Sequence, residues 1–102
     1  MNVLLSCSGG MSSSLIAEAI EDAGKKIGRE VSVKATGTQH VADDLNDGNF
    51  DIVLLAPQSI YAKDQVEKDA NASNLPFILI PRNLYNPFSG EKLLNLILEK
   101  LN

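Results

Sequence analysis

Short apolar runs alternate with amphipathic stretches along the whole chain, and this alternation limits the folds open to it. The runs lie at Val3–Leu5, Glu30–Thr36, Ile52–Ala56 and Phe77–Ile80. The second alternates apolar and polar residues, as a half-exposed strand does, whereas the others are continuously apolar, as buried parallel strands are. We therefore expect four strands, one of them half-exposed.

Each stretch between or after these strands has apolar residues at helical spacing. The predicted helices are Leu15–Ile27 with Gly28 as its C-cap, a short one over Thr38–Asp47, one that follows the turn Pro57-Gln58-Ser59 and ends near Ala70, and Lys92–Leu101. Gln58 or Ser59 is the expected cap of the third. Strict strand–helix alternation predicts an α/β fold with a small four-stranded parallel sheet. Its strands follow the flavodoxin-like doubly wound order, and helices cover both faces.

Length, charge and cysteine content narrow the class of protein. The 102 residues suit one domain spanning 1–102. A net charge of −4 argues against nucleic acid as a partner. No apolar run is long enough to cross a bilayer, and no basic segment precedes the first strand, so neither membrane insertion nor a signal peptide is expected. A single cysteine needs no oxidising compartment, and we expect a cytoplasmic protein.

Cys7, that single cysteine, stands at the end of the first strand and at the head of a glycine- and serine-rich turn. In doubly wound sheets, ligands bind outside the carboxyl ends of the strands, where the strand order reverses. There a thiol meets backbone N–H groups and the positive end of a helix dipole, which favour a thiolate and attract oxyanions. Cys7 is thus the candidate nucleophile. The alternative is a small buried hydrophobe.

The turn after Cys7 is the candidate phosphate-binding loop, formed by Ser8, Gly9, Gly10, Met11, Ser12, Ser13 and Ser14. Its N–H groups can hold phosphoryl oxygens while a thiolate carries the phosphorus. Gly9 and Gly10 allow close backbone approach. The serine hydroxyls add donors, or they serve only to cap the helix that follows.

Several related chemistries are excluded or disfavoured by the same loop. The chain has no nucleotide-triphosphate loop and no Cys-x-x-Cys pair. Cysteine phosphatases place an arginine six residues after the nucleophile, where this chain has Ser13. Without that guanidinium, the site is suited to carrying phosphate more than to hydrolysing it. A low-molecular-weight phosphatase-like or arsenate-reductase-like enzyme remains the alternative, and a flavin- or anion-binding module is a third hypothesis.

The loop residues Cys7–Leu15 resemble the phosphorylation loop of the B component (enzyme IIB) of the bacterial phosphoenolpyruvate-dependent sugar phosphotransferase system. The resemblance is to its lactose/cellobiose/diacetylchitobiose branch. The segment Asp51–Gln58 is similar to the third strand and Ala-Pro-Gln turn of that family, and Tyr85 falls where the family places a tyrosine after the fourth strand. The resemblance covers essentially the whole chain.

This resemblance implies a phosphoryl relay that needs no cofactor and no metal. A phosphohistidine of the A component would donate to Cys7. The phosphocysteine would then pass the group to a sugar held by the membrane C component, a sugar of the β-glucoside/cellobiose, chitobiose or lactose type. Such transfers call for an exposed cysteine and a partly apolar docking surface. Pro57, Gln58 and Tyr85 are the candidate docking residues, with Met11 beside them; a capping or core-edge role is the alternative for Met11 and Tyr85.

Three further polar features invite a functional interpretation, but a simpler one suits each. His40 is interpreted as a surface histidine at the start of a helix. Arg82 either approaches the phosphoryl group or is a solvated arginine. The acidic residues Asp43, Asp44, Asp47 and Asp51 lack calcium-loop spacing and are interpreted as a solvated face.

Overall fold

A single parallel sheet forms the centre of the fold in the computed structural model, which describes residues 1–8 and 12–102. Its strands are β1 (Asn2–Cys7), β2 (Ser32–Gly37), β3 (Ile52–Leu55) and β4 (Phe77–Leu79). They are ordered β2-β1-β3-β4 with every neighbouring pair parallel. This confirms the predicted four-stranded sheet and its flavodoxin-like order, with β1 and β3 at the centre.

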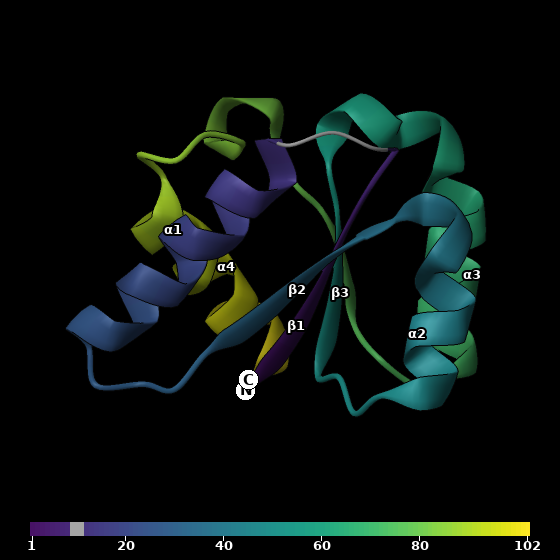
Figure 1. Cartoon of the computed structure of the whole chain (residues 1–102), viewed down its shortest axis with the longest axis horizontal. Helices are drawn as coiled ribbons and strands as arrows, with labels where there is room; N and C mark the ends of the chain where they lie inside the picture. The colour runs from purple at the N-terminus through teal and green to yellow at the C-terminus, as the bar shows by residue number, and fades with distance from the viewer. Residues whose placement is uncertain (9–11) are drawn as a thin grey trace.

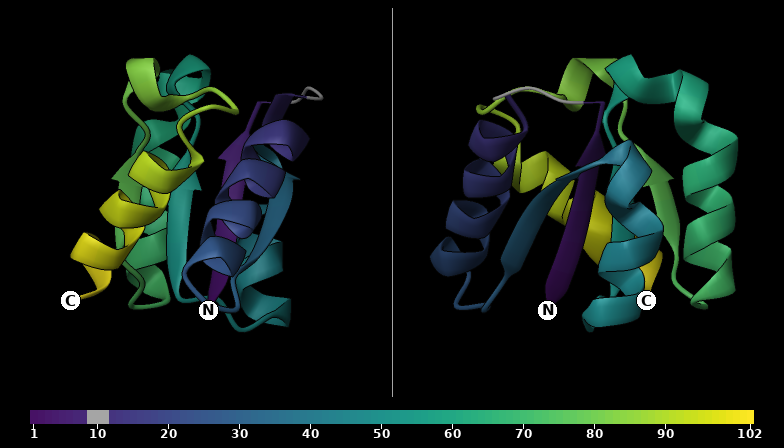
Figure 2. Two further views of the ribbon diagram at one scale, coloured as in Figure 1. Left: turned by 90° about the vertical axis from the view of Figure 1, so that its left-hand side faces the viewer. Right: turned by 45° about the vertical axis from the view of Figure 1, so that its right-hand side comes forward.

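Helices cover both faces of the sheet, as predicted (Figures 1 and 2). On one face lie α1 (Ser12–Lys26) and α4 (Gly90–Leu101), and on the other α2 (Val41–Asp47) and α3 (Lys63–Ala72). Because strand side chains alternate between faces, Leu5 and Leu54 join the core under α1 and α4, whereas Leu4 and Val53 join the core under α2 and α3. Among the described residues, no helix combines the length and apolarity that a membrane crossing requires.

The carboxyl edge of the sheet carries three short 3-10 helices: η1 (Thr38–His40), η2 (Pro57–Ala62) and η3 (Arg82–Leu84). In Figure 1, η2, η3 and the start of α1 lie together at the top, above the ends of β1 and β3. The site that parallel-sheet topology predicts is therefore at this edge.

The segment after β3 differs from the predicted continuous helix. It forms η2 first and then α3, whose N-cap is Ala62 with no side-chain cap hydrogen bond. The prediction of Gln58 or Ser59 as a helix cap is therefore wrong. Ser59 has non-helical backbone angles (φ −102°, ψ 26°), and its hydroxyl is engaged elsewhere.

The end of α1 confirms Gly28 as the C-cap glycine. Its φ is +72°, a left-handed conformation that glycine adopts without a Cβ penalty. The N–H of Arg29 donates to the carbonyl of Gly24 at 2.9 Å, and that of Gly28 donates to Lys25 at 3.2 Å, which is the Schellman pattern. At its other end α1 begins at Ser12, earlier than the predicted Leu15.

Candidate active site

Cys7 is the last residue of β1 and lies opposite Gly37 of β2 in the sheet register. The strand thus delivers it to the carboxyl edge beside the topological switch point, as predicted. Its side chain is only 4% exposed. The expectation of an exposed thiol is therefore wrong for this structure.

Hydrogen bonds fix the backbone on both sides of Cys7. Before it, the N–H of Ala56 donates to the carbonyl of Ser6 at 2.9 Å, and the Ser6 hydroxyl donates to the carbonyl of Leu54 at 2.7 Å. After it, the N–H of Ser8 donates to the hydroxyl oxygen of Ser59 at 2.7 Å. The segment around Cys7 is thus attached to β3 and to η2.

The N-terminus of α1 gives this edge a positive electrostatic character. Its first turn contains serines and no carboxylate, whereas Lys25 and Lys26 complement the dipole in its last turn. The other three α-helices each carry a carboxylate in the first turn, from Asp43 and Asp44, Asp64 and Glu91 respectively. The dipole of α1 therefore has no acidic partner in its first turn, and an anion fits there.

The predicted phosphate-binding loop is described only in part. Gly9, Gly10 and Met11 lie outside the described residues, as does the side chain of Ser12. Ser13 is buried in the first turn of α1, and Ser14 is exposed. The sequence analysis predicted that the N–H of Ser8 would donate to an anion. In this structure it donates to the hydroxyl of Ser59.

The three predicted docking residues differ in accessibility. Gln58 is exposed, whereas Pro57 is buried. Tyr85 packs partly buried against the core under α1 and α4, and its hydroxyl is shielded from solvent. Gln58 is therefore accessible to a partner, whereas Pro57 and the Tyr85 hydroxyl are not.

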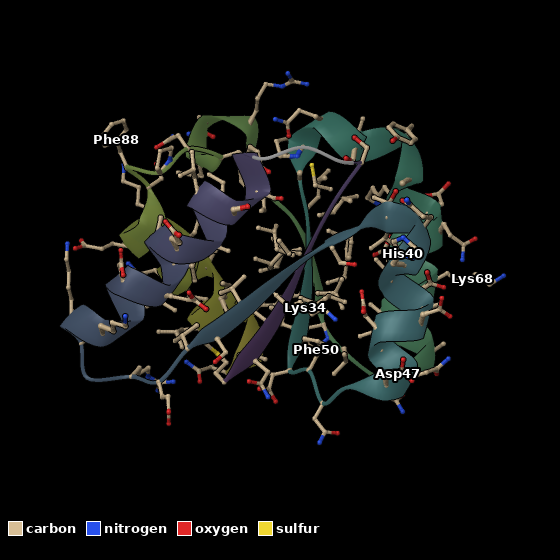
Figure 3. The ribbon with its side chains drawn as sticks, viewed as in Figure 1. Lys34, His40, Asp47, Phe50, Lys68 and Phe88 are labelled. Atoms are coloured by element: carbon tan, nitrogen blue, oxygen red, sulfur yellow. The ribbon has the colours of Figure 1, made fainter. Side chains whose placement is uncertain are left out.

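Four exposed apolar side chains lie on segments at the carboxyl edge, and the sequence analysis did not identify them as exposed. They are Leu15 on the first turn of α1, Ile60 and Tyr61 on η2, and Phe88 in the loop before α4. Phe88 is 96% exposed and projects away from the fold (Figure 3). Contiguous exposed apolar patches characterise interaction surfaces, whereas singly exposed apolar residues are common on any protein. The signal was available, because Ile60 and Tyr61 fall outside any apolar stripe of a predicted helix.

The remaining polar candidates have structural surroundings. His40 is exposed at the end of η1 and is the N-cap residue of α2 (Figure 3). The prediction of a surface histidine at a helix start is therefore confirmed. Arg82 is exposed at the start of η3, and its guanidinium makes no ion pair within the described parts of the chain.

The acidic residues are divided among separate contacts. Asp44 accepts hydrogen bonds from Lys34 at 2.9 Å and from the Thr36 hydroxyl. Asp51 accepts the backbone N–H of Asn2 at 2.7 Å, which ties the start of β3 to that of β1. These two carboxylates hold strands and helices together and are not simply solvated.

Comparison with known proteins places this geometry in a family. The family model "PTS system, Lactose/Cellobiose specific IIB subunit" matches residues 2–96. The oligo-beta-mannoside-specific EIIB component of Bacillus subtilis is 31% identical, over 88% of this chain and 85% of its own. The galactose-specific EIIB component of Lactococcus lactis is 29% identical, over 90% of this chain and 88% of that relative.

Solved structures agree with the fold. The cellobiose-specific IIB component of Borrelia burgdorferi superposes with a TM-score of 0.78 at 32% identity, covering 100% of this chain and 92% of that one. The lactose-specific IIB domain of Streptococcus pneumoniae has a TM-score of 0.86 at 22% identity, covering 100% of this chain and 98% of that one. With the sheet order and the position of Cys7, these matches show that the chain belongs to the lactose/cellobiose-specific IIB subunits of the phosphotransferase system.

Proposed function

We propose that this IIB subunit is a phosphoryl carrier that uses Cys7 as its phosphorylated residue. The observation that carries the proposal is the position of Cys7. It ends the central strand β1 at the carboxyl edge of the sheet, five residues before an α1 N-terminus that lacks a carboxylate in its first turn. We assign the whole of residues 1–102 to one IIB domain, working in the cytoplasm.

The first transfer is an attack of the Cys7 thiolate on the phosphorus of a phosphohistidine in the A component. An S–P bond forms as the N–P bond breaks, the imidazole leaves with the electron pair, and the proton lost by the thiol balances the charge on that imidazole. The backbone N–H groups of the loop and the dipole of α1 stabilise the phosphoryl oxygens. The remaining candidate loop residues, Ser8 to Ser14, surround that group.

The second transfer goes from phosphocysteine to a sugar bound by the membrane C component. A sugar hydroxyl oxygen attacks phosphorus, the S–P bond breaks, and Cys7 leaves as a thiolate while the hydroxyl proton is released. A thiolate is both a competent nucleophile and a good leaving group, so it suits both steps. Relatives named for oligo-β-mannoside, galactose and cellobiose support a β-linked di- or oligosaccharide or galactose as the transported class.

The test is to supply phosphoenolpyruvate, the general phosphotransferase proteins and an A component of this family, with radiolabelled phosphate. We expect one alkylation-sensitive phosphoryl group per chain, absent from Cys7→Ser. Ser73→Ala is the matched control, because Ser73 is exposed at the C-cap of α3 and the change removes one serine hydroxyl outside the candidate loop.

Two results would overturn the proposal. One is labelling of Cys7→Ser to the level of the unmodified protein, which would place the phosphoryl group on another residue. The other is steady turnover of an aryl phosphate by the protein alone, which would favour the phosphatase-like alternative.

A further inference from the structure

We propose that Ser59 is a positioning residue for Cys7: its hydroxyl holds the backbone of Ser8 and thereby fixes the thiol for phosphoryl transfer. The inference rests on the proposed function of Cys7. It concerns a residue 51 positions from Ser8 along the chain, in a turn where the sequence analysis predicted a helix cap.

The contact between the two residues is short and part-buried, and it joins the exposed residue Ser8 to a buried side chain. The N–H of Ser8 donates to the Ser59 hydroxyl oxygen at 2.7 Å, and Ser59 is 0% exposed. A buried hydroxyl is costly unless it is hydrogen-bonded, so the contact with Ser8 stabilises the buried Ser59 side chain.

Ser59 is itself hydrogen-bonded to Ala56, the residue that follows β3. Its N–H donates to the carbonyl of Ala56 at 3.0 Å, and Ala56 in turn donates to the carbonyl of Ser6 at 2.9 Å. The non-helical backbone of Ser59 interrupts η2 at this point. The Ser59 hydroxyl therefore connects the backbone after Cys7 to the same strand that holds the backbone before it.

The two sides of Cys7 depend on side chains to different degrees. Ser6 also has a buried hydroxyl bonded to β3, but its backbone is held independently through Ala56. Ser8 lies beyond the last residue of β1, and its described contact with η2 is made by the Ser59 side chain. Removing the Ser59 hydroxyl should thus loosen the attachment on one side of the nucleophile, whereas removing that of Ser6 should not.

The complete burial of Ser59 also allows a positioning role to be distinguished from a role in partner docking. Ser59 cannot touch an A component that approaches from solvent, so its loss should leave the KM unchanged. A displaced nucleophile slows the transfer step itself, and a shift of about 1 Å costs up to ~100-fold in rate. Ser59→Ala should therefore lower kcat with little change in KM.

The experiment compares Ser59→Ala with Ser6→Ala. Both positions are buried serines, and each variant removes one hydroxyl. We expect Ser59→Ala to lower the kcat of Cys7 phosphorylation at least tenfold, with KM within twofold of the unmodified protein. Ser6→Ala should keep kcat within twofold. Alkylation of Cys7 by iodoacetamide should become faster in Ser59→Ala, because a loosened segment exposes the thiol, so the two reactions should change in opposite directions.

Amide hydrogen exchange of Ser8, followed by NMR, tests the contact without any partner protein. The Ser8 amide should be protected in the unmodified protein and should lose that protection in Ser59→Ala. An unprotected Ser8 amide in the unmodified protein would overturn the proposal, even if Ser59→Ala did not fold. So would an unchanged kcat in folded Ser59→Ala, or an equal loss in both serine variants. Failure of the unmodified protein to accept phosphate would instead refute the proposed function, while exchange and alkylation still report on Ser59.

Discussion

The carboxylate of Glu21 in α1 accepts a hydrogen bond from the backbone N–H of Val33 in β2 at 2.8 Å. β2 is an edge strand of the sheet. Its neighbouring residue Ser32 donates inward to the carbonyl of Met1, so the next N–H along the strand faces outward. The helix side chain thus occupies a donor that would otherwise be open to pairing with another chain.

Replacing Glu21 with alanine should lower the free energy of unfolding by about 1 kcal/mol, because the Val33 N–H loses a charged acceptor. Urea denaturation measures this. Glu18→Ala is the control, since Glu18 is exposed on the same helix and has no hydrogen-bond partner within the described part of the chain. An equal loss in both variants would show that helix propensity, and not the edge contact, is responsible.

Asp44 should make the stability of the protein depend on acid pH. Burial raises the pKa of Asp44, but hydrogen bonds from Lys34 and Thr36 and the charge of Lys34 outweigh it, so the pKa lies below its ordinary value. A carboxyl with a depressed folded pKa contributes stability above its unfolded pKa of about 3.9 and loses it as the pH falls through the folded value.

Asp44→Asn should therefore be less stable than the unmodified protein by about 1 kcal/mol at pH 7, and the gap should narrow below pH ~4. Denaturation midpoints over a pH series provide the measurement. Asp43→Asn, an exposed neighbour on the same helix, should show no such pH-dependent gap. A gap for Asp44→Asn that stays constant down to pH ~3 would contradict this linkage.

The sheet could be predicted from the sequence because each strand has its own local apolar pattern. Continuous apolar runs such as Ile52–Leu55 mark buried parallel strands, and right-handed crossovers then leave few strand orders. The position of Cys7 followed from that order. The contacts of Ser59 with Ser8 and of Glu21 with Val33 could not be predicted in this way, because each joins a side chain of one element to the backbone of another and leaves no periodic pattern. The burial of Cys7 also depends on packing at the carboxyl edge that no local motif encodes.

Gly90 of α4 lies against the backbone of α1 at Ala19, and Gly90→Ala should destabilise the fold by about 2 kcal/mol. A Cβ at this position would lie 2.4 Å from the carbonyl oxygen of Ala19 and 2.8 Å from its carbon. These are backbone atoms, so relief requires α1 to move. Thermal unfolding should show the loss, and Cys7 phosphorylation should slow with it, because α1 also forms the anion-stabilising end of the site.

Gly28→Ala distinguishes the clash from a general intolerance of substituted glycines. A Cβ at Gly28 meets nothing within 4 Å, so its cost comes only from the positive φ and should be about 1 kcal/mol. Gly28→Asn should recover part of that loss, since asparagine tolerates the left-handed conformation. Ala19→Gly should not rescue Gly90→Ala, and a rescue would show that the Ala19 side chain, not its carbonyl, is the obstacle.

The exposed apolar residues of η2 should contribute to binding the phosphoryl donor. Ile60 is 57% exposed on a segment that begins directly after β3, at the edge where Cys7 lies. Burying such a side chain against a partner is worth about 1 kcal/mol or more, so Ile60→Ser should raise the KM for the phosphorylated A component roughly fivefold. The kcat should stay unchanged, since Ile60 does not hold the Cys7 segment.

Ile27→Ser is the matched control for this surface. Ile27 is 58% exposed, almost the same as Ile60, but it follows the last residue of α1, at the opposite end of that helix from its Ser12 start near Cys7. Initial rates over a range of donor concentrations should therefore show a raised KM for Ile60→Ser and an unchanged KM for Ile27→Ser. Equal effects would mean that exposed apolar area in general, and not the carboxyl edge, governs the encounter. A fall in kcat with constant KM for Ile60→Ser would instead assign η2 a purely positioning role.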